Sequence, residues 1–379
     1  MSILLDEGQQ AIATECRRVL EARSDKGRLL GLLEQVGACD AVFRDTAVEQ
    51  GWTALAIAEE HGGLGLGLIE LGLVAQAAGG VISGAPFLTV GYGAARVLAE
   101  AGSAEVQAAW LPRLASGAAT ATVAFAEGNA PLPPRPTTTF AGGRLTGVKE
   151  GVVAGLAADI AVVWAMSAGE PALVLVELSG AARNPVDGFD NSRLYADLAF
   201  AEVPATLLAR GGVARALALD VLARMAVVTA HEQTGGAEAL LTIARGQADR
   251  DGRRETVIDE TRKAFGQPIG AFQSVKHRIA ELYGLVEIAR ANCIHAAALA
   301  DAPGGAAGFL LAAADARISA TEAYDTAARD CVQIHGGIGV TWEQGLHLHM
   351  RRARSLAIEQ GNLLFWEDLL VDQLTGEAV

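Results

Sequence analysis

Aromatic side chains make up only 5% of this 379-residue chain, although hydrophobic residues make up 51%. The interior must therefore be built mainly from alanine, leucine, valine and isoleucine. Because alanine and leucine favour helices, the composition predicts a mostly helical protein. The chain is also too long for one ordinary hydrophobic core, so we expect two or three packed domains.

Long hydrophobic runs are absent as well: none reaches the roughly 20 residues that a helix needs to cross a bilayer. The first residues, MSILLDEGQQ, lack the basic segment and apolar core of a secretory signal. A mean hydropathy of +0.28 then indicates extensive burial, including helix faces that pack against other subunits. We expect a cytoplasmic oligomer without a membrane partner.

Cysteine is scarce and positive charge is in deficit. The four cysteines have no CxxC or other metal-ligand spacing, which predicts reduced, buried thiols and no metal site. A net charge of −14 argues against a nucleic-acid or anionic-membrane partner. An anionic ligand such as a nucleotide would need a local basic patch.

The spacing of apolar residues changes along the chain. Helical spacing runs through residues 11–30 and 68–98, and Pro86 must interrupt the second segment. Short β-branched runs such as residues 160–165 and 172–178 follow, separated by proline and glycine, and these predict strands.

Helical spacing then returns over three long segments, residues 214–244, 272–300 and 308–334. Long helices with thick apolar faces usually pair in an antiparallel bundle. The sequence therefore predicts three domains: an N-terminal helical domain (1–118), a middle β domain (119–212) and a C-terminal helical bundle (213–379).

Two glycine-containing stretches could approach a ligand. In residues 261–282 a basic helix end runs into a glycine loop, an arrangement that could hold a phosphate or be an ordinary turn with solvated charges. In residues 333–353 three glycines end a helix and Gln333 offers an amide. His347 and His349 are two positions apart, so on a helix they do not share a face and make a poor metal pair.

Three motifs, in order, resemble those of the flavin-dependent acyl-CoA dehydrogenases. The early motif of that family, Glu-Glu-Tyr-Gly-Gly-Leu-Gly, is similar to EEHGGLG at residues 59–65. The family opens its C-terminal bundle with an arginine, a Phe-Gly-x-x-Ile loop and a Phe-Gln pair, matched here by Arg262, Phe265, Gly266, Ile269, Phe272 and Gln273. The family's later Gln-x-x-Gly-Gly-x-Gly matches Gln333, Gly336, Gly337 and Gly339.

The resemblance implies a mainly α fold with a central β domain: N-terminal helices, a small β-barrel or β-sandwich, and a C-terminal antiparallel four-helix bundle. It also implies FAD, held between domains and across a subunit interface. An arginine would meet the FAD pyrophosphate and neighbouring side chains its adenosine half, partly from another subunit. The cofactor contacts expected on this basis are Arg262, Phe265, Gln273, Gln333, Gly336, Gly337 and Asn362.

The middle domain departs from the family pattern. A Thr-Glu-Pro-like stretch corresponds here to AFAEGNAPLP, which keeps Glu127 but has Ala126 in place of the hydroxyl residue. The Gly-Ser-Asp element is missing. A tryptophan-bearing strand that shields the flavin in the family is replaced by GVVAGLAADIAVV, in which Asp159 is still recognisable.

The catalytic base departs too. Where the family usually keeps a glutamate, the alignment places Gln360, and an amide cannot abstract a proton. Glu359 is one residue away, a rotation of about 100° on a helix. Some family members carry the base on the first bundle helix instead, where Ala226 is the best match and Glu232 lies farther along. Glu359 and Glu232 are therefore the candidate catalytic residues.

The resemblance implies oxidation of an acyl-CoA to the 2,3-enoyl-CoA, with electrons passed to an electron-transfer flavoprotein. The divergent middle domain is similar to the subgroup that serves unusual acyl groups, including steroid or ring-derived ones, more than to the fatty-acid enzymes. One alternative is a catalytically impaired subunit of a heteromeric dehydrogenase whose partner supplies the base. Another is a fold relative that uses flavin for oxygen chemistry or serves as an interaction scaffold.

Overall fold

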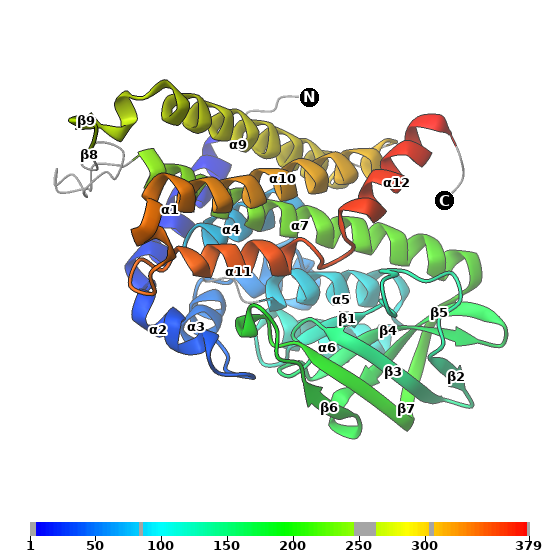
Figure 1. The fold of residues 1–379 in the computed structure, drawn as a ribbon. Helices are drawn as coiled ribbons and strands as arrows, with labels where there is room; N and C mark the ends of the chain where they lie inside the picture. Colours follow the sequence, from blue (N-terminus) through cyan, green and yellow to red (C-terminus); the bar gives the residue numbers. More distant parts are fainter. Residues whose placement is uncertain (1–4, 83–85, 246–262, 303–306, 377–379) are drawn as a thin grey trace.

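The computed structural model describes residues 5–82, 86–245, 263–302 and 307–376 (Figure 1). Figure 1 shows the long helices lying side by side, with the β strands gathered below one end of them. Within the described ranges, no helix is both long and apolar enough to cross a membrane.

The first third of the chain is helical, with two short 3-10 turns, η1 (Trp52–Ala54) and η2 (Glu59–His61). The segment expected to be one helix over 11–30 is two, because Asp25 caps the second by accepting a hydrogen bond from the Arg28 amide at 2.6 Å. Pro86 precedes a new helix, as predicted. The helices are α1 (Glu7–Arg23), α2 (Lys26–Leu33), α3 (Ala41–Glu49), α4 (Leu68–Gly80), α5 (Phe87–Ala101) and α6 (Ala104–Ala115).

The middle of the chain forms a seven-stranded sheet in the order β1-β4-β2-β3-β7-β5, with β6 paired to β7. Because β4 also pairs with β5, the sheet closes on itself as a small barrel. Leu145, Val163 and Leu198 are among the buried side chains that fill one of its faces. The strands are β1 (Ala121–Ala124), β2 (Thr139–Ala141), β3 (Arg144–Val152), β4 (Ile160–Ser167), β5 (Glu170–Glu177), β6 (Ala182–Pro185) and β7 (Ala196–Arg210).

The last part of the chain is a bundle in which α10 packs against both α7 and α9. α7 also crosses α4 closely: a Cβ on Gly235 would stand 1.8 Å from the carbonyl oxygen of Gln76. Only glycine allows this approach, which joins the N-terminal helices to the bundle. The helices are α7 (Gly211–Arg245), α9 (Gln273–Ala300), α10 (Phe309–His335), α11 (Leu346–Leu356) and α12 (Leu363–Thr375).

The three long segments predicted from apolar spacing therefore form α7, α9 and α10, and the mainly α fold with a central β domain is confirmed. The cysteines are free thiols; Cys16, Cys293 and Cys331 are buried as predicted, and Cys39 is partly exposed. Residues 246–262, which include the predicted cofactor contact Arg262, lie outside the described residues.

Candidate active site

A cavity of about 400 Å³ lies where the barrel meets the bundle, beside the connection between α11 and α12. Its walls come from the end of β1, the end of β3, α7 and residues 358–362. The apolar part is formed by Val90, Val123, Phe125, Leu222 and Met225, and the polar side chains on it are Asn129, Glu150, Tyr195, Glu359, Gln360 and Asn362. An apolar cavity with a few polar groups is typical of a small-molecule site.

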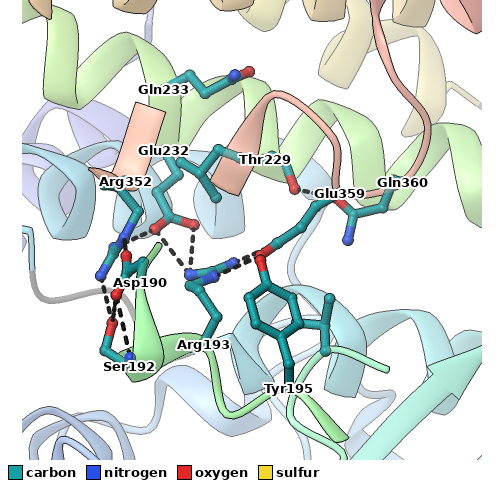
Figure 2. Close-up of polar contacts among 12 residues, drawn as sticks. Asp190, Ser192, Arg193, Tyr195, Thr229, Glu232, Gln233, Arg352, Glu359 and Gln360 are labelled. Carbon is teal, nitrogen blue, oxygen red and sulfur yellow. Dashed lines mark hydrogen bonds and ion pairs between the residues drawn. The ribbon is translucent and has the colours of Figure 1, made fainter. Parts of the chain in front are cut away.

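Gln360 faces this cavity from a tight turn of the backbone. Gln360 and Gly361 have φ angles of 54° and 102°, so the chain reverses between α11 and α12 at these residues. The hydroxyl of Thr229, on α7, donates to the Gln360 Oε1 atom at 2.7 Å. This bond occupies the amide oxygen and leaves the nitrogen end pointing away from Thr229 (Figure 2).

Glu359, the first candidate base, is buried and held by three hydrogen bonds. Arg193 donates from Nε to Oε1 at 2.8 Å and from Nη2 to Oε2 at 2.7 Å. The Tyr195 hydroxyl adds a third bond to Oε1 at 2.6 Å. Both carboxylate oxygens are thus engaged, in the fork geometry that makes arginine–carboxylate pairs strong.

Glu232, the second candidate, lies on α7 and is engaged in the same way. Its Oε1 atom accepts from Arg193 Nη1 at 3.1 Å and from Arg352 Nη1 at 2.7 Å. Arg352, on α11, also donates to Asp190 in the barrel. We call these five residues, Asp190, Arg193, Glu232, Arg352 and Glu359, the buried ion network (Figure 2).

The charges of the buried ion network are closely balanced. Its three carboxylates face two guanidinium groups, and Arg317 supplies a third by donating to the main-chain oxygen of Glu359 at 2.8 Å. Burial opposes charge on Arg193, but Glu232 and Glu359 hold its pKa well above the ordinary value. Burial also disfavours charge on Asp190, yet Arg352 lowers the pKa of that carboxyl. The charged state of each side chain in the network therefore depends on the charges of its neighbours.

The sequence did not indicate this network, although it proposed both glutamates. Arg193 follows β6 in the barrel, Glu232 is on α7, and Arg352 and Glu359 flank the end of α11. Arg193 and its two glutamate partners are 39 and 166 positions apart along the chain, so no local sequence pattern indicates that they meet. The contacts of Tyr195 and Thr229 with residues 359 and 360 were missed for the same reason.

A second buried ion pair supports the loop at one side of the cavity. Lys149 is fully buried on β3 and donates to the Glu127 carboxylate at 2.7 Å. Glu127 also accepts from the main-chain amides of Thr137 and Thr138, at 2.6 and 3.1 Å. Burial would raise the pKa of Glu127, but the hydrogen bonds from Lys149 and Thr137 lower it to about 2.

This low pKa predicts how stability depends on pH. Glu127→Gln should lower the free energy of unfolding by about 2 kcal/mol at neutral pH, because Lys149 and the main-chain amides stabilise the charged carboxylate in the folded state more than water does in the unfolded chain. The stabilisation is present above the unfolded pKa and is lost as the pH falls through the folded pKa of about 2. Urea unfolding of wild type and variant at about pH 7 and about pH 3 measures the difference. A difference that does not shrink at low pH would contradict the assignment.

The predicted cofactor residues fall into two groups. Phe265 lies in the turn between β8 (Lys263–Ala264) and β9 (Gln267–Pro268), where its ring is 98% exposed and its φ angle is 51°. Gln273 starts α9 and is also exposed. Gln333, Gly336 and Gly337 are at the end of α10, which an ion pair between Arg278 and Asp330 ties to the start of α9.

Asn362 is separate from these residues: it lines the cavity, and they do not. Its side-chain oxygen caps α12 by accepting from the Phe365 amide at 3.0 Å. In Figure 1 the β8–β9 turn lies at one end of the bundle, and the start of α12 lies toward the other end. One chain therefore does not bring all the predicted cofactor contacts to one place.

Comparisons with known proteins agree with this architecture. The family model of the acyl-CoA dehydrogenase N-terminal domain matches residues 6–118, and that of the acyl-CoA dehydrogenase C-terminal domain matches residues 258–363. The acyl-CoA dehydrogenase IpdE2 of Mycobacterium tuberculosis is 31% identical over 321 residues, which cover 85% of this chain and 82% of that protein.

Two solved structures have the same fold. A variant of the Tcur3481–Tcur3483 steroid ACAD is 25% identical, with a TM-score of 0.83 and 98% of each chain covered. A glutaryl-CoA dehydrogenase from Mycobacterium smegmatis in complex with FADH2 is 20% identical, with a TM-score of 0.85. The match covers 99% of this chain and 96% of that one.

Proposed function

This chain belongs to the acyl-CoA dehydrogenase family, and we propose that it serves in the α,β-dehydrogenation of an acyl-CoA thioester as a subunit without a catalytic base. The product is the 2,3-enoyl-CoA, and an electron-transfer flavoprotein is the expected electron acceptor. The observation that carries the proposal is the amide of Gln360 on the cavity wall, next to glutamates held by arginine.

The reaction requires a base because a thioester α-proton is only weakly acidic. A positioned and desolvated carboxylate is the usual means of removing such a proton. Gln360 has no proton-accepting group of this kind. Glu359 could act only by giving up bonds from Arg193 and Tyr195 in a buried setting. Glu150 also lines the cavity, but it is exposed on β3 and therefore solvated.

FAD fits the exposed residues at the end of the bundle. The ring of Phe265 stands almost fully in solvent on a left-handed backbone, with the Phe272 ring 6.3 Å away. Gln273 follows Phe272 directly and is exposed, so a stacking surface and an amide are both available for an adenosine half. When bound, FAD supplies the acceptor for the hydride that leaves the β-carbon. Because Asn362 lies elsewhere, we infer that a cofactor touching both groups is shared between subunits.

Helix α12 of this chain presents an exposed apolar surface on which a second subunit could pack. Leu364, Val371 and Leu374 are 62%, 53% and 66% exposed on α12, and their spacing places them on one face of the helix. Such an exposed apolar stripe is typical of a subunit interface. The similar steroid ACAD has a two-part name, Tcur3481–Tcur3483, which favours a related dehydrogenase subunit as partner and a steroid or ring-derived acyl group as substrate.

The Glu359→Gln variant tests the proposal. We expect the protein isolated with its co-purifying subunits to keep most of its dehydrogenase turnover, because Glu359 does not act as the base. Glu232→Gln is the matched control, since it removes a charge from the same network. Turnover is measured with a dye acceptor at a temperature where circular dichroism shows both variants folded. A fall of about 100-fold or more in Glu359→Gln alone would identify Glu359 as the base.

A further inference from the structure

Two polar side chains of the cavity keep unused hydrogen-bonding capacity of opposite kinds. Tyr195 and Gln360 both line it, and they are linked through Glu359, which binds Tyr195 at 2.6 Å and directly precedes Gln360. Buried hydrogen bonds orient both side chains. Tyr195 is bonded to Glu359, which Arg193 holds in place, and Gln360 is bonded to Thr229. They are thus fixed in direction before any ligand binds.

Tyr195 offers an acceptor. Its hydroxyl proton is committed to Glu359, and burial together with the Glu359 charge raises the pKa of Tyr195 well above its ordinary value, so the proton stays in place. A hydroxyl group has one donor and two acceptor lone pairs. What Tyr195 can still give to a ligand is therefore a lone pair.

Gln360 offers a donor. Its amide oxygen is bonded to Thr229, and among the described residues no acceptor is bonded to its amide nitrogen. An amide nitrogen carries two N–H groups and no lone pair suited to accepting a hydrogen bond. The nitrogen end of Gln360 can therefore only donate to a ligand in the cavity.

We propose that Tyr195 and Gln360 together bind an alcohol group on the acyl part of the thioester, so that the cavity selects hydroxyacyl groups over unsubstituted ones. An alcohol accepts one hydrogen bond from Gln360 and donates another to Tyr195. A ketone can accept the bond from Gln360, but it has no proton to donate to Tyr195. A plain hydrocarbon leaves both polar groups desolvated without a partner, which is costly. The inference rests on the proposed function, because it places the acyl group in this cavity.

The remaining walls agree with such a ligand. Val90, Val123 and Leu222 provide an apolar surface for the hydrocarbon part. The described residues that line the cavity include no Lys, Arg or His that could pair with a carboxylate on the acyl group. The chemistry of the cavity thus favours a neutral, hydroxylated acyl group.

Isothermal titration of the full-length chain, loaded with FAD, tests the selection. The ligands are octanoyl-CoA, its positional hydroxy isomers and the matching oxo isomers. We expect at least one hydroxy isomer to bind about tenfold more tightly than octanoyl-CoA and more tightly than its oxo counterpart, as two net hydrogen bonds allow. Tyr195→Phe and Gln360→Met should each reduce the preference, and Arg210→Leu, a change in an exposed ion pair that does not line the cavity, should leave it unchanged.

The outcomes separate this inference from the proposed function. Equal affinity for all the thioesters in the wild type, or a preference that survives in both variants, overturns the role of Tyr195 and Gln360. The proposed function then still stands, because a thioester site is present. Failure of every thioester to bind, with or without FAD, overturns both.

Discussion

Arg193→Leu is expected to lower the free energy of unfolding by about 3–5 kcal/mol, the typical cost of breaking a buried ion pair by removing one partner. The Arg193 side chain is fully buried and donates to both Glu359 and Glu232. Removing it leaves two buried carboxylates with too few donors, and burial of an unpaired charge is among the largest destabilising effects of a single substitution.

The effect should also reach the junction between the barrel and the bundle. Arg193 precedes β7 in the barrel, whereas its two carboxylate partners belong to α7 and the α11–α12 connection. Loss of the guanidinium therefore removes a link between these parts. It also frees Glu359, and with it the Tyr195 hydroxyl, to adopt other positions.

Urea unfolding, followed by circular dichroism, measures this loss. Arg210→Leu is the matched control, because Arg210 pairs with Glu170 at the surface, where the two side chains are 46% and 56% exposed. Exposed pairs contribute about 0–1 kcal/mol, so the control should unfold almost like the wild type. Equal losses in Arg193→Leu and Arg210→Leu would show that the buried ion network does not hold the barrel to the bundle.

Gln360→Glu is expected to accelerate flavin reduction by a bound acyl-CoA by about 10²–10⁴-fold, the usual contribution of general base catalysis. The substitution changes one amide nitrogen to oxygen and keeps the Thr229 bond, since Thr229 donates to Oε1. The new carboxylate would face an apolar cavity without an arginine bonded to residue 360, in contrast to Glu359. Desolvation of this kind favours proton abstraction.

Anaerobic stopped-flow spectroscopy of the FAD-loaded chain, with an acyl-CoA in excess, measures the rate of flavin bleaching. Gln360→Met serves as the control, because it has similar length and no ionisable group. We expect bleaching in Gln360→Glu and none above background in Gln360→Met. No acceleration in Gln360→Glu would mean that the side chain of residue 360 does not reach the α-proton of the substrate.

The helical parts of the fold could be predicted because their signals are local. The segments over 214–244, 272–300 and 308–334 repeat apolar residues at helical spacing, and the structure has helices at nearly the same bounds. The division of residues 11–30 into α1 and α2 could not be read from spacing alone, because one capping carboxylate, Asp25, decides it.

The candidate site was predictable only in part. Gln360 was found through the family motif, and the structure places it on the cavity wall. The state of Glu359 could not be predicted, because it depends on Arg193 and Tyr195, which lie more than 160 positions earlier in the chain. A glutamate at this position reads the same in sequence whether it is a free base or one half of an ion pair.

The most direct test is the visible spectrum of the purified chain alone, loaded with FAD and mixed anaerobically with a set of acyl-CoA and hydroxyacyl-CoA thioesters. A subunit without a base should keep its flavin absorbance unchanged after every addition. Flavin that is bleached by the wild-type chain alone, and not by the Glu359→Gln variant, would contradict the proposal and make Glu359 the base.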